Sequence, residues 1–211
     1  RLNLKNAQEC FHDLLYYRDE VRSHFQHGTM NFREQAHADA IFWNILTQIA
    51  GLVRDVKFVP EELRGLDSAL CDIYYGNFSV FQSLPDAWAI EQLFPVVPLH
   101  RLDQRPDRNA IIADITCDCD GKLDRFIDLH DVRRTLPVHS LVGDDPYFLG
   151  VFLVGAYQET LGDLHNLLGD TNVVSVNCTA QGEIEFSREI IGDSVADVLS
   201  YVEYDPREMT D

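Results

Sequence analysis

The sequence predicts an α+β fold in which a helical bundle is followed by an antiparallel β-domain. Two observations lead to this prediction. Residues 1–77 repeat apolar side chains at helical spacing, and from Asn77 onward short apolar runs alternate with prolines and other turn residues. The chain has 211 residues, 45% of them hydrophobic, which is enough for one sizeable core or two small ones.

The helical segment contains three expected amphipathic helices with short links. The first begins near Leu4 and is stopped by Gly28. The second runs from Asn31, an N-cap residue type, to about Arg54. The third opens at Pro60, and its apolar stripe consists of Leu63, Leu66, Leu70 and Ile73. Such a bundle carries no visible chemistry, so we expect it to serve as a scaffold or an interface.

The segment after the bundle has the texture of a small β-domain with irregular loops. A strand is expected over Asn77–Phe81, and Gln181-Gly182 stands between two strand-like runs, as in a hairpin turn. Three further runs of strand length are Ala110–Ile115, Tyr147–Val154 and Val173–Val176. A last helix, capped by Asp193 or Ser194, is expected to run through Tyr201.

The charge balance excludes several classes of partner. Lysine and arginine number 17 against 35 aspartates and glutamates, so the net charge is −18 and the pI is about 4.6. A nucleic-acid backbone or an anionic membrane would be repelled by this field. A cationic substrate would suit it, although acidity that merely keeps the chain soluble is the more common reason.

The cysteines and the two ends of the chain bear on its location and completeness. Five scattered cysteines favour free thiols in a reducing compartment, so we expect a cytoplasmic protein. No apolar run is long enough to span a membrane, and the charged first residues do not form a signal peptide. The chain opens on Arg1 and closes at Asp211 just where a helix is about to start, so we expect both ends to be cut from a longer polypeptide.

The first segment with chemical potential is Asp114-Ile-Thr-Cys-Asp-Cys-Asp-Gly-Lys122, where a strand ends in a loop of thiols and carboxylates. If the strand continues, Cys117 and Cys119 lie on one side, and Asp118 and Asp120 lie on the other. A lone Cys-x-Cys lacks the second ligand pair of a zinc site, so we predict no metal site. Spacing alone favours an acidic turn beside a small buried cysteine.

Two further segments offer an anion donor and a cation acceptor. Tyr157 follows an apolar strand and Gly155-Ala156, so its phenol can donate a hydrogen bond to a phosphate, although a packed tyrosine is the more common case. Asp86 stands near Trp88, and a carboxylate beside an indole suits a guanidinium. The alternative is that Asp86 only caps a helical turn. His165 is expected to be structural.

Taken together and in order, the longer motifs resemble the biosynthetic arginine decarboxylase family over essentially all 211 residues. The motifs that carry the resemblance are Asp13-Leu-Leu-Tyr-Tyr17, Leu70-Cys-Asp-Ile-Tyr-Tyr75, Asn77-Phe-Ser-Val-Phe-Gln-Ser-Leu-Pro-Asp-Ala-Trp88, Gln92-Leu-Phe-Pro95, Asp114-Ile-Thr-Cys-Asp118, Gly155-Ala-Tyr-Gln-Glu159, Leu164-His-Asn-Leu167 and Gly169-Asp-Thr171.

This resemblance implies a domain plan. Residues 1–77 resemble the helical bundle inserted in that family, residues 78–190 its C-terminal β-domain, and residues 191–211 the start of its C-terminal helical extension. The family's (β/α)8 barrel, which binds pyridoxal 5′-phosphate (PLP) and carries the cofactor lysine, is expected to lie outside this chain. Members use PLP and often Mg²⁺, and no convincing magnesium site stands out here.

The resemblance, together with related ornithine decarboxylases, also implies roles for individual residues. Cys117 would reach across a homodimer interface and protonate Cα after CO2 departs, and Tyr157 would donate its hydroxyl to the PLP phosphate. Asp118 would bind the cationic end of L-arginine. Asp86 matches a second substrate-side carboxylate less securely, and Asp120 is added for its proximity.

Two functions remain open at this point. The first is part of an enzyme that converts L-arginine to agmatine and CO2 for polyamine synthesis, inactive as an isolated chain. The second is a non-catalytic module that binds or regulates a decarboxylase subunit. Retention of Cys117 and Tyr157 favours the enzyme, because a module freed from catalysis needs neither. A sibling decarboxylase for another cationic amino acid is a third possibility, and the helical insertion favours arginine.

Overall fold

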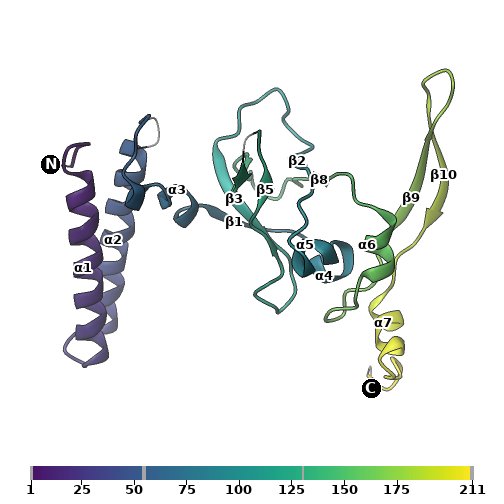
Figure 1. Cartoon of the computed structure of the whole chain (residues 1–211). Coiled ribbons are helices and arrows are strands. Elements are labelled where there is room, and N and C mark those ends of the chain that lie inside the picture. Colours follow the sequence, from purple (N-terminus) through teal and green to yellow (C-terminus); the bar gives the residue numbers. More distant parts are fainter. Residues whose placement is uncertain (1, 54–55, 130, 210–211) are drawn as a thin grey trace. The chain divides into compact units, whose positions relative to one another are not determined.

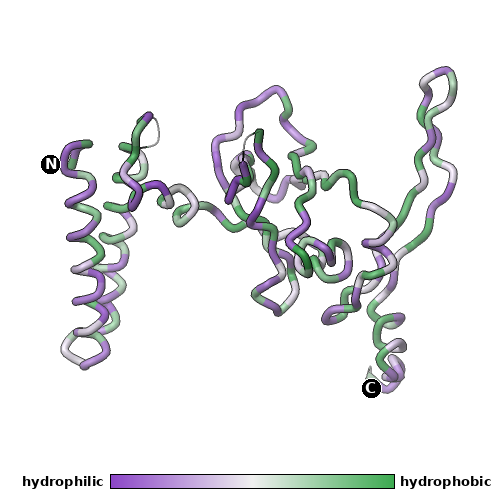
Figure 2. The backbone as a smooth tube through the Cα atoms, in the orientation of Figure 1, coloured by the Kyte–Doolittle hydropathy of each residue, from purple (hydrophilic) through white to green (hydrophobic). Residues whose placement is uncertain are grey.

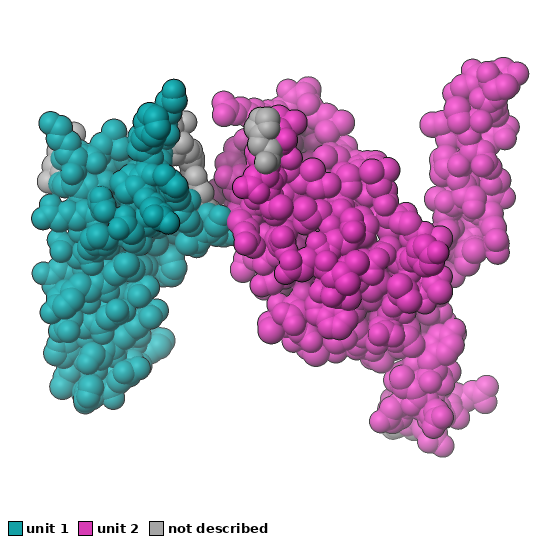
Figure 3. Space-filling model, viewed as in Figure 1, with its two compact units in different colours: residues 1–71 teal, residues 72–211 magenta. Residues whose placement is uncertain are grey.

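The computed structural model describes residues 2–53, 56–129 and 131–209. The chain divides into two compact units, residues 1–71 and residues 72–211 (Figure 3). Unit 1 is built on a pair of long helices, and unit 2 contains several small sheets with short helices (Figure 1). The predicted α+β class, with helices first and mainly antiparallel strands after them, is therefore confirmed.

In unit 1, α1 (Ala7–Gln26) and α2 (Phe32–Val53) pack against each other. Gly28 has φ +70°, a left-handed conformation that ends α1 as predicted. The side chain of Asn31 accepts a hydrogen bond from the Glu34 N–H at 3.0 Å, while the Glu34 carboxylate accepts one from the Asn31 N–H at 2.9 Å. This reciprocal pair confirms the predicted start of α2. Arg54, the expected end of that helix, lies outside the described residues.

The expected third long helix is wrong, and the helical unit is built on two long helices. The segment forms a 3₁₀ turn (Glu61–Leu63), the short α3 (Leu66–Ala69) and then strand β1 (Asp72–Tyr75). Leu63 and Leu66 do enter the core of unit 1, which explains the apolar stripe. The stripe ends there because Ile73 and the two tyrosines after it are strand-forming residues that pair in the sheet of unit 2.

The main sheet of unit 2 is organised around β3 (Arg108–Ala113). β3 pairs in parallel with β1, and it pairs antiparallel with β4 (Lys122–Leu123) and with β7 (Leu136–Val138). Among the described strands of unit 2, the β1–β3 pair is thus the parallel exception to antiparallel pairing. The core beneath this sheet consists of Val80, Leu84, Phe94, Ala110, Ile112, Leu123, Phe126, Leu136 and Val138.

Two small ladders accompany this sheet. β2 (Val96–Pro98) pairs with β8 (Leu149–Val151), and β5 (Phe126–Ile127) pairs with β6 (Val132–Arg133), both antiparallel. β8 is shorter than the strand expected over Tyr147–Val154.

Short helices replace two of the expected strand features. The segment expected as a strand over Asn77–Phe81 contains Ser79, whose side chain caps α4 (Val80–Ser83) by accepting from the Gln82 N–H at 3.2 Å. α5 (Pro85–Ala89) follows directly. Tyr157 was expected at a strand end, but it lies in the first turn of α6 (Ala156–Leu161).

The last elements agree with prediction. β9 (Val173–Cys178) and β10 (Ile184–Ile190) form an antiparallel hairpin whose turn contains Gly182 at φ +83°. Hydrophobic and hydrophilic stretches follow one another along both strands (Figure 2). α7 (Val195–Tyr201) begins with a reciprocal cap between Ser194 and Asp197. Among the described residues, no helix is long and apolar enough to cross a membrane.

Candidate functional site

The loop after β3 is fixed by a buried carboxylate. Asp114 is only 3% exposed, and its Oδ2 accepts a hydrogen bond from the Val80 N–H at 2.8 Å. Its Oδ1 accepts from the Thr116 N–H at 2.9 Å and from the Thr116 hydroxyl at 2.7 Å. Because a buried carboxylate is stable only when its oxygens are paired, these contacts anchor the start of the loop to the N-terminus of α4.

The other end of the loop is bonded to the backbone of the same aspartate. The Asp114 N–H donates to the Gly121 carbonyl at 2.8 Å. A Cβ at position 121 would lie 2.2 Å from Asp114 Oδ1, so the backbone approaches the carboxylate more closely than any other residue type allows. Residues 115–120 are therefore held as a closed loop at the end of β3.

Cys117 lies on this loop and is contacted by an amide from far along the chain. The Cys117 N–H donates to Asn166 Oδ1 at 3.1 Å, and Asn166 Nδ2 donates to Cys117 Sγ at 3.2 Å. Cys117 remains exposed. The thiol is thus held in place while it is still accessible from outside the chain.

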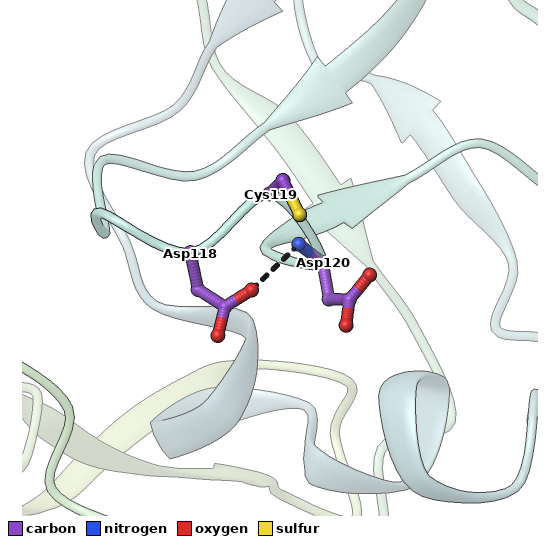
Figure 4. Close-up of side chains that lie close together, drawn as sticks. All are labelled: Asp118, Cys119 and Asp120. Carbon is purple, nitrogen blue, oxygen red and sulfur yellow. Dashed lines mark hydrogen bonds between the residues drawn. The ribbon is translucent and has the colours of Figure 1, made fainter.

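Asp118, Cys119 and Asp120 form the exposed tip of the loop (Figure 4). The Asp120 N–H donates to Asp118 Oδ1 at 2.9 Å, and one oxygen or sulfur atom from each of the three residues lies within 4.8 Å of the others. Three exposed groups in the described chain are fewer than the four protein ligands of a closed zinc site. The absence of a metal site here stays a prediction.

Asp86 and Tyr157 belong to a second group on α5 and α6. Gln158 Nε2 donates to Asp86 Oδ2 at 2.6 Å, and the Asp86 N–H donates to Gln158 Oε1 at 3.1 Å. Gln158 is 4% exposed, so this reciprocal pair is a structural contact between the two helices. Tyr157, which precedes Gln158 in the sequence, is 77% exposed.

Helix α4 connects the two groups. The Phe81 ring stacks on the His165 ring with centroids 4.3 Å apart, and it meets Trp88 of α5 edge-on at 5.2 Å. The Phe81 carbonyl accepts from the Asp163 N–H at 3.1 Å. The turn that carries Asn166 is therefore attached to α4, as the loop that carries Cys117 is.

Sequence reasoning did not assign three residues that build this arrangement. In the sequence, Asp114 falls within the expected strand Ala110–Ile115, and Gln158 and Asn166 occur only as members of the motifs that carry the family resemblance. The positions of Asn166 and Cys117 differ by 49 residues, so no local pattern could have joined them.

A cavity of about 730 Å³ lies elsewhere in unit 2. Its walls are mainly apolar and aromatic and include Tyr74, Phe78, Tyr147 and Phe148, but none of the predicted site residues. The Tyr74 hydroxyl donates to the His139 carbonyl at 2.8 Å, and partial burial, the largest cause, raises the pKa of Tyr74. We place the candidate chemistry at the Cys117 loop, where the reactive side chains are, and not at this cavity.

Comparison with known proteins connects this arrangement to one family. Residues 1–67 match the arginine decarboxylase helical bundle domain. The whole chain is 46% identical over 210 residues to a biosynthetic arginine decarboxylase from Nostoc sp., and 48% identical over 208 residues to one from Phocaeicola vulgatus. These matches cover 100% and 99% of this chain, but only 31% and 33% of the relatives.

A solved structure agrees with this result. The crystal structure of the biosynthetic arginine decarboxylase SpeA from Campylobacter jejuni matches with a TM-score of 0.80 and 32% sequence identity, and the match covers 100% of this chain and 32% of that one. The chain spans about a third of the length of the relatives it matches. The chain is therefore homologous over its whole length to the C-terminal portion of biosynthetic arginine decarboxylases.

Proposed function

We propose that this chain is the C-terminal part of a PLP-dependent arginine decarboxylase that converts L-arginine to agmatine and CO2 in cytoplasmic polyamine biosynthesis. The observation that carries the proposal is the exposed Cys117 thiol, held by Asn166 on a loop that a buried carboxylate anchors. A thiol can serve as a proton donor, and a loop of fixed geometry is what a donor aimed at one carbon requires.

The chain's own residues fit part of a PLP site. Tyr157 offers an exposed phenol, which is a suitable donor to a phosphate oxygen. None of the five predicted site residues lines the cavity of about 730 Å³, and we propose that the remainder of the site is contributed from outside this chain. When bound, PLP supplies an electron sink for the bond to the departing CO2.

The reacting proton and the substrate's charged end are assigned to the Cys117 loop. Cys117 donates its proton to Cα of the decarboxylated substrate, so that an S–H bond breaks and a C–H bond forms. Asp118 binds the guanidinium, because a carboxylate and a guanidinium form paired charge-assisted hydrogen bonds. Asp120 lies on the same exposed tip and adds negative charge. Asp86 keeps one oxygen for substrate, since only Oδ2 is engaged by Gln158.

We further propose that the active site is shared between two copies in a homodimer or a higher homo-oligomer. Cys117, Asp118 and Asp120 are all exposed in the isolated chain, as groups that complete a neighbour's site must be before assembly. Mg²⁺ is assigned to no residue of the described chain, because exposed acidic groups like those at the loop tip are common in proteins without a bound ion.

The proposal is tested on the full gene product. The coding sequence upstream of Arg1 is read first, and a (β/α)8 barrel of roughly 250 residues or more is expected there. The encoded protein should release equal amounts of agmatine and CO2 from L-arginine with PLP, whereas the 211-residue chain alone should release neither.

Paired variants then test the assigned residue. Cys117→Ala should lower kcat by about 10²-fold or more, as expected for loss of a proton donor. Cys119→Ala, an exposed thiol two residues away on the same loop, should leave the rate unchanged. Equal rates for the two variants would remove Cys117 from the mechanism. A start codon just upstream of Arg1, with no barrel, would instead favour a non-catalytic module that binds a decarboxylase subunit.

A further inference from the structure

One side chain makes two directed contacts with the proposed proton donor. The Asn166 amide accepts from the Cys117 backbone N–H through its oxygen and donates to the Cys117 sulfur through its nitrogen, at 3.1 Å and 3.2 Å. We infer that Asn166 is the positioning residue of the proposed decarboxylation reaction. It fixes the direction of the Cys117 thiol, and its amide N–H donates a hydrogen bond to the sulfur after the thiol proton has left. This inference rests on the proposed function of Cys117.

The two contacts fix more than either would alone. The backbone contact sets the position of residue 117 in the loop, and the contact to Sγ selects the side-chain rotamer. An Asn amide offers its acceptor and its donor in one plane, so it can bind both atoms at once only if the loop keeps its geometry. The pair therefore turns an exposed, freely rotating thiol into one with a single direction.

The contact to sulfur also has the right polarity for the reaction. A neutral thiol is a weak acceptor, whereas a sulfur that has given up its proton carries negative charge, and hydrogen bonds to ionised groups are roughly twice as strong as neutral ones. The donation from Asn166 Nδ2 is therefore strengthened as the S–H bond breaks and the C–H bond forms at Cα. An interaction that grows toward the transition state accelerates the step.

Asn166 itself is held in a conformation that needs support. It has φ +55°, which only Gly, Asn and Asp adopt readily. The turn is closed by the Leu168 N–H, which donates to the His165 carbonyl at 3.2 Å, and the His165 ring stacks on Phe81. Since Asp114 anchors the Cys117 loop to Val80, both partners are attached to α4 and keep their separation.

Two substitutions separate the contacts without straining the backbone. Asn166→Gly removes both hydrogen bonds, and Asn166→Asp keeps the oxygen that accepts from the Cys117 N–H but loses the donor to sulfur. Gly and Asp both tolerate positive φ, so neither variant should disturb the turn. Asn77→Asp adds the same charge at another exposed position of unit 2 and serves as the control.

The first readout needs no catalysis. Amide hydrogen exchange, measured by NMR on the ¹⁵N-labelled 211-residue chain, should be about tenfold faster for the Cys117 N–H in Asn166→Gly, the factor expected for loss of one hydrogen bond. Asn166→Asp and Asn77→Asp should keep the protection of the wild-type chain. Equal exchange rates of the Cys117 amide in the wild-type chain and in Asn166→Gly would show that Asn166 does not hold this amide.

The second readout is the reaction of the full gene product. Both Asn166 variants should lower kcat by about 10- to 100-fold while KM changes by less than about twofold, and agmatine formed per CO2 released should fall below one. A purely structural residue would change the amount of folded enzyme and leave this ratio at one. Wild-type kcat and a ratio of one in Asn166→Asp would overturn the inference.

The two proposals fail in distinguishable ways. If Cys117→Ala keeps its full rate and its equal yields of agmatine and CO2, the assigned role of Cys117 is wrong and the positioning role of Asn166 is wrong with it. If Cys117→Ala is impaired and both Asn166 variants are not, the proposed function stands and only the role of Asn166 is refuted.

Discussion

The buried carboxylate of Asp114 makes the sharpest prediction about stability. Asp114→Ala removes the acceptor of three hydrogen bonds, one from the Val80 N–H and two from Thr116. Val80 is 0% exposed, so water cannot reach its N–H in place of the lost oxygen. The substitution therefore leaves a buried donor without a partner and releases the start of the Cys117 loop.

The magnitude follows from these contacts. An unpaired buried donor costs about 1–3 kcal/mol. Thr116 is partly exposed and can be rehydrated, so its two bonds add about 1–2 kcal/mol. We expect Asp114→Ala to lower the free energy of unfolding of unit 2 by about 2–5 kcal/mol, a large part of the 5–15 kcal/mol typical of a domain. Asp114→Asn should cost about 1–3 kcal/mol, because its amide nitrogen cannot accept from the Val80 N–H.

The assay uses the two tryptophans of the chain, Trp43 in unit 1 and Trp88 in unit 2. In a Trp43→Phe background, urea unfolding followed by fluorescence reports on unit 2 through Trp88, whose ring contacts Phe81. Asp120→Ala, at the exposed loop tip, is the control and should stay within about 0.5 kcal/mol of the parent. A change equally small for Asp114→Ala would refute the argument.

Three further predictions concern single sites. Gly121→Ala should destabilise unit 2 by about 1–3 kcal/mol in the same urea assay, because the new Cβ would lie 2.2 Å from Asp114 Oδ1; a neutral effect would contradict the close approach. Phe42→Ala should lower the free energy of unfolding of unit 1 by about 3–5 kcal/mol, because it leaves a cavity in the core. Urea unfolding followed by circular dichroism measures this change, and a loss well below this range would contradict the prediction. Hydrogen bonds from Ser194 hold the pKa of Asp197 below its ordinary value, so the stability they give is present above the unfolded pKa of about 3.9 and is lost as pH falls through the folded one. Ser194→Ala should raise the pKa of Asp197, and an unchanged NMR titration of that carboxyl would contradict this cause.

The features that the sequence predicted well are those with local signals. Gly28 ends α1, Asn31 caps α2, Gly182 lies in the hairpin turn and Ser194 caps α7, and each of these residues acts on neighbours within a few positions. Side-chain periodicity and capping chemistry are enough to find such elements.

The features that were missed depend on distant partners. Pro60 and the apolar stripe after it suggested one helix, but Ile73 pairs with Ile111 in a parallel ladder, and that partner decides its conformation. The strand expected at Asn77–Phe81 is displaced by α4, whose first N–H is bonded to Asp114. Tertiary contacts of this kind override local preference and leave no periodic trace in the sequence.

The candidate site shows the same division. Cys117, Asp118 and Tyr157 were selected through the resemblance of their motifs to a known family, because spacing alone favoured a buried cysteine and a packed tyrosine. Their support could not: Asn166 and Asp114 are ordinary polar residues until folding brings them against the loop. The assigned roles of the five predicted site residues stay predictions that the proposed experiments test.

The parallel pairing of β1 with β3 has a consequence for how the protein is made. On the ribosome, α1 and α2 are complete and adjacent before any of unit 2 exists, so their contacts can form at once. β1 emerges next, but its partner β3 follows only after residues 76–107 have been synthesised. Until β3 has been synthesised, the backbone N–H and C=O groups of β1 that pair with it have no partner strand, and long-range pairing of this kind is slow. We therefore expect this part of the protein to fold in two stages during synthesis. The helices of unit 1 pack first, and the sheet forms later, when β3 pairs with β1, β4 and β7.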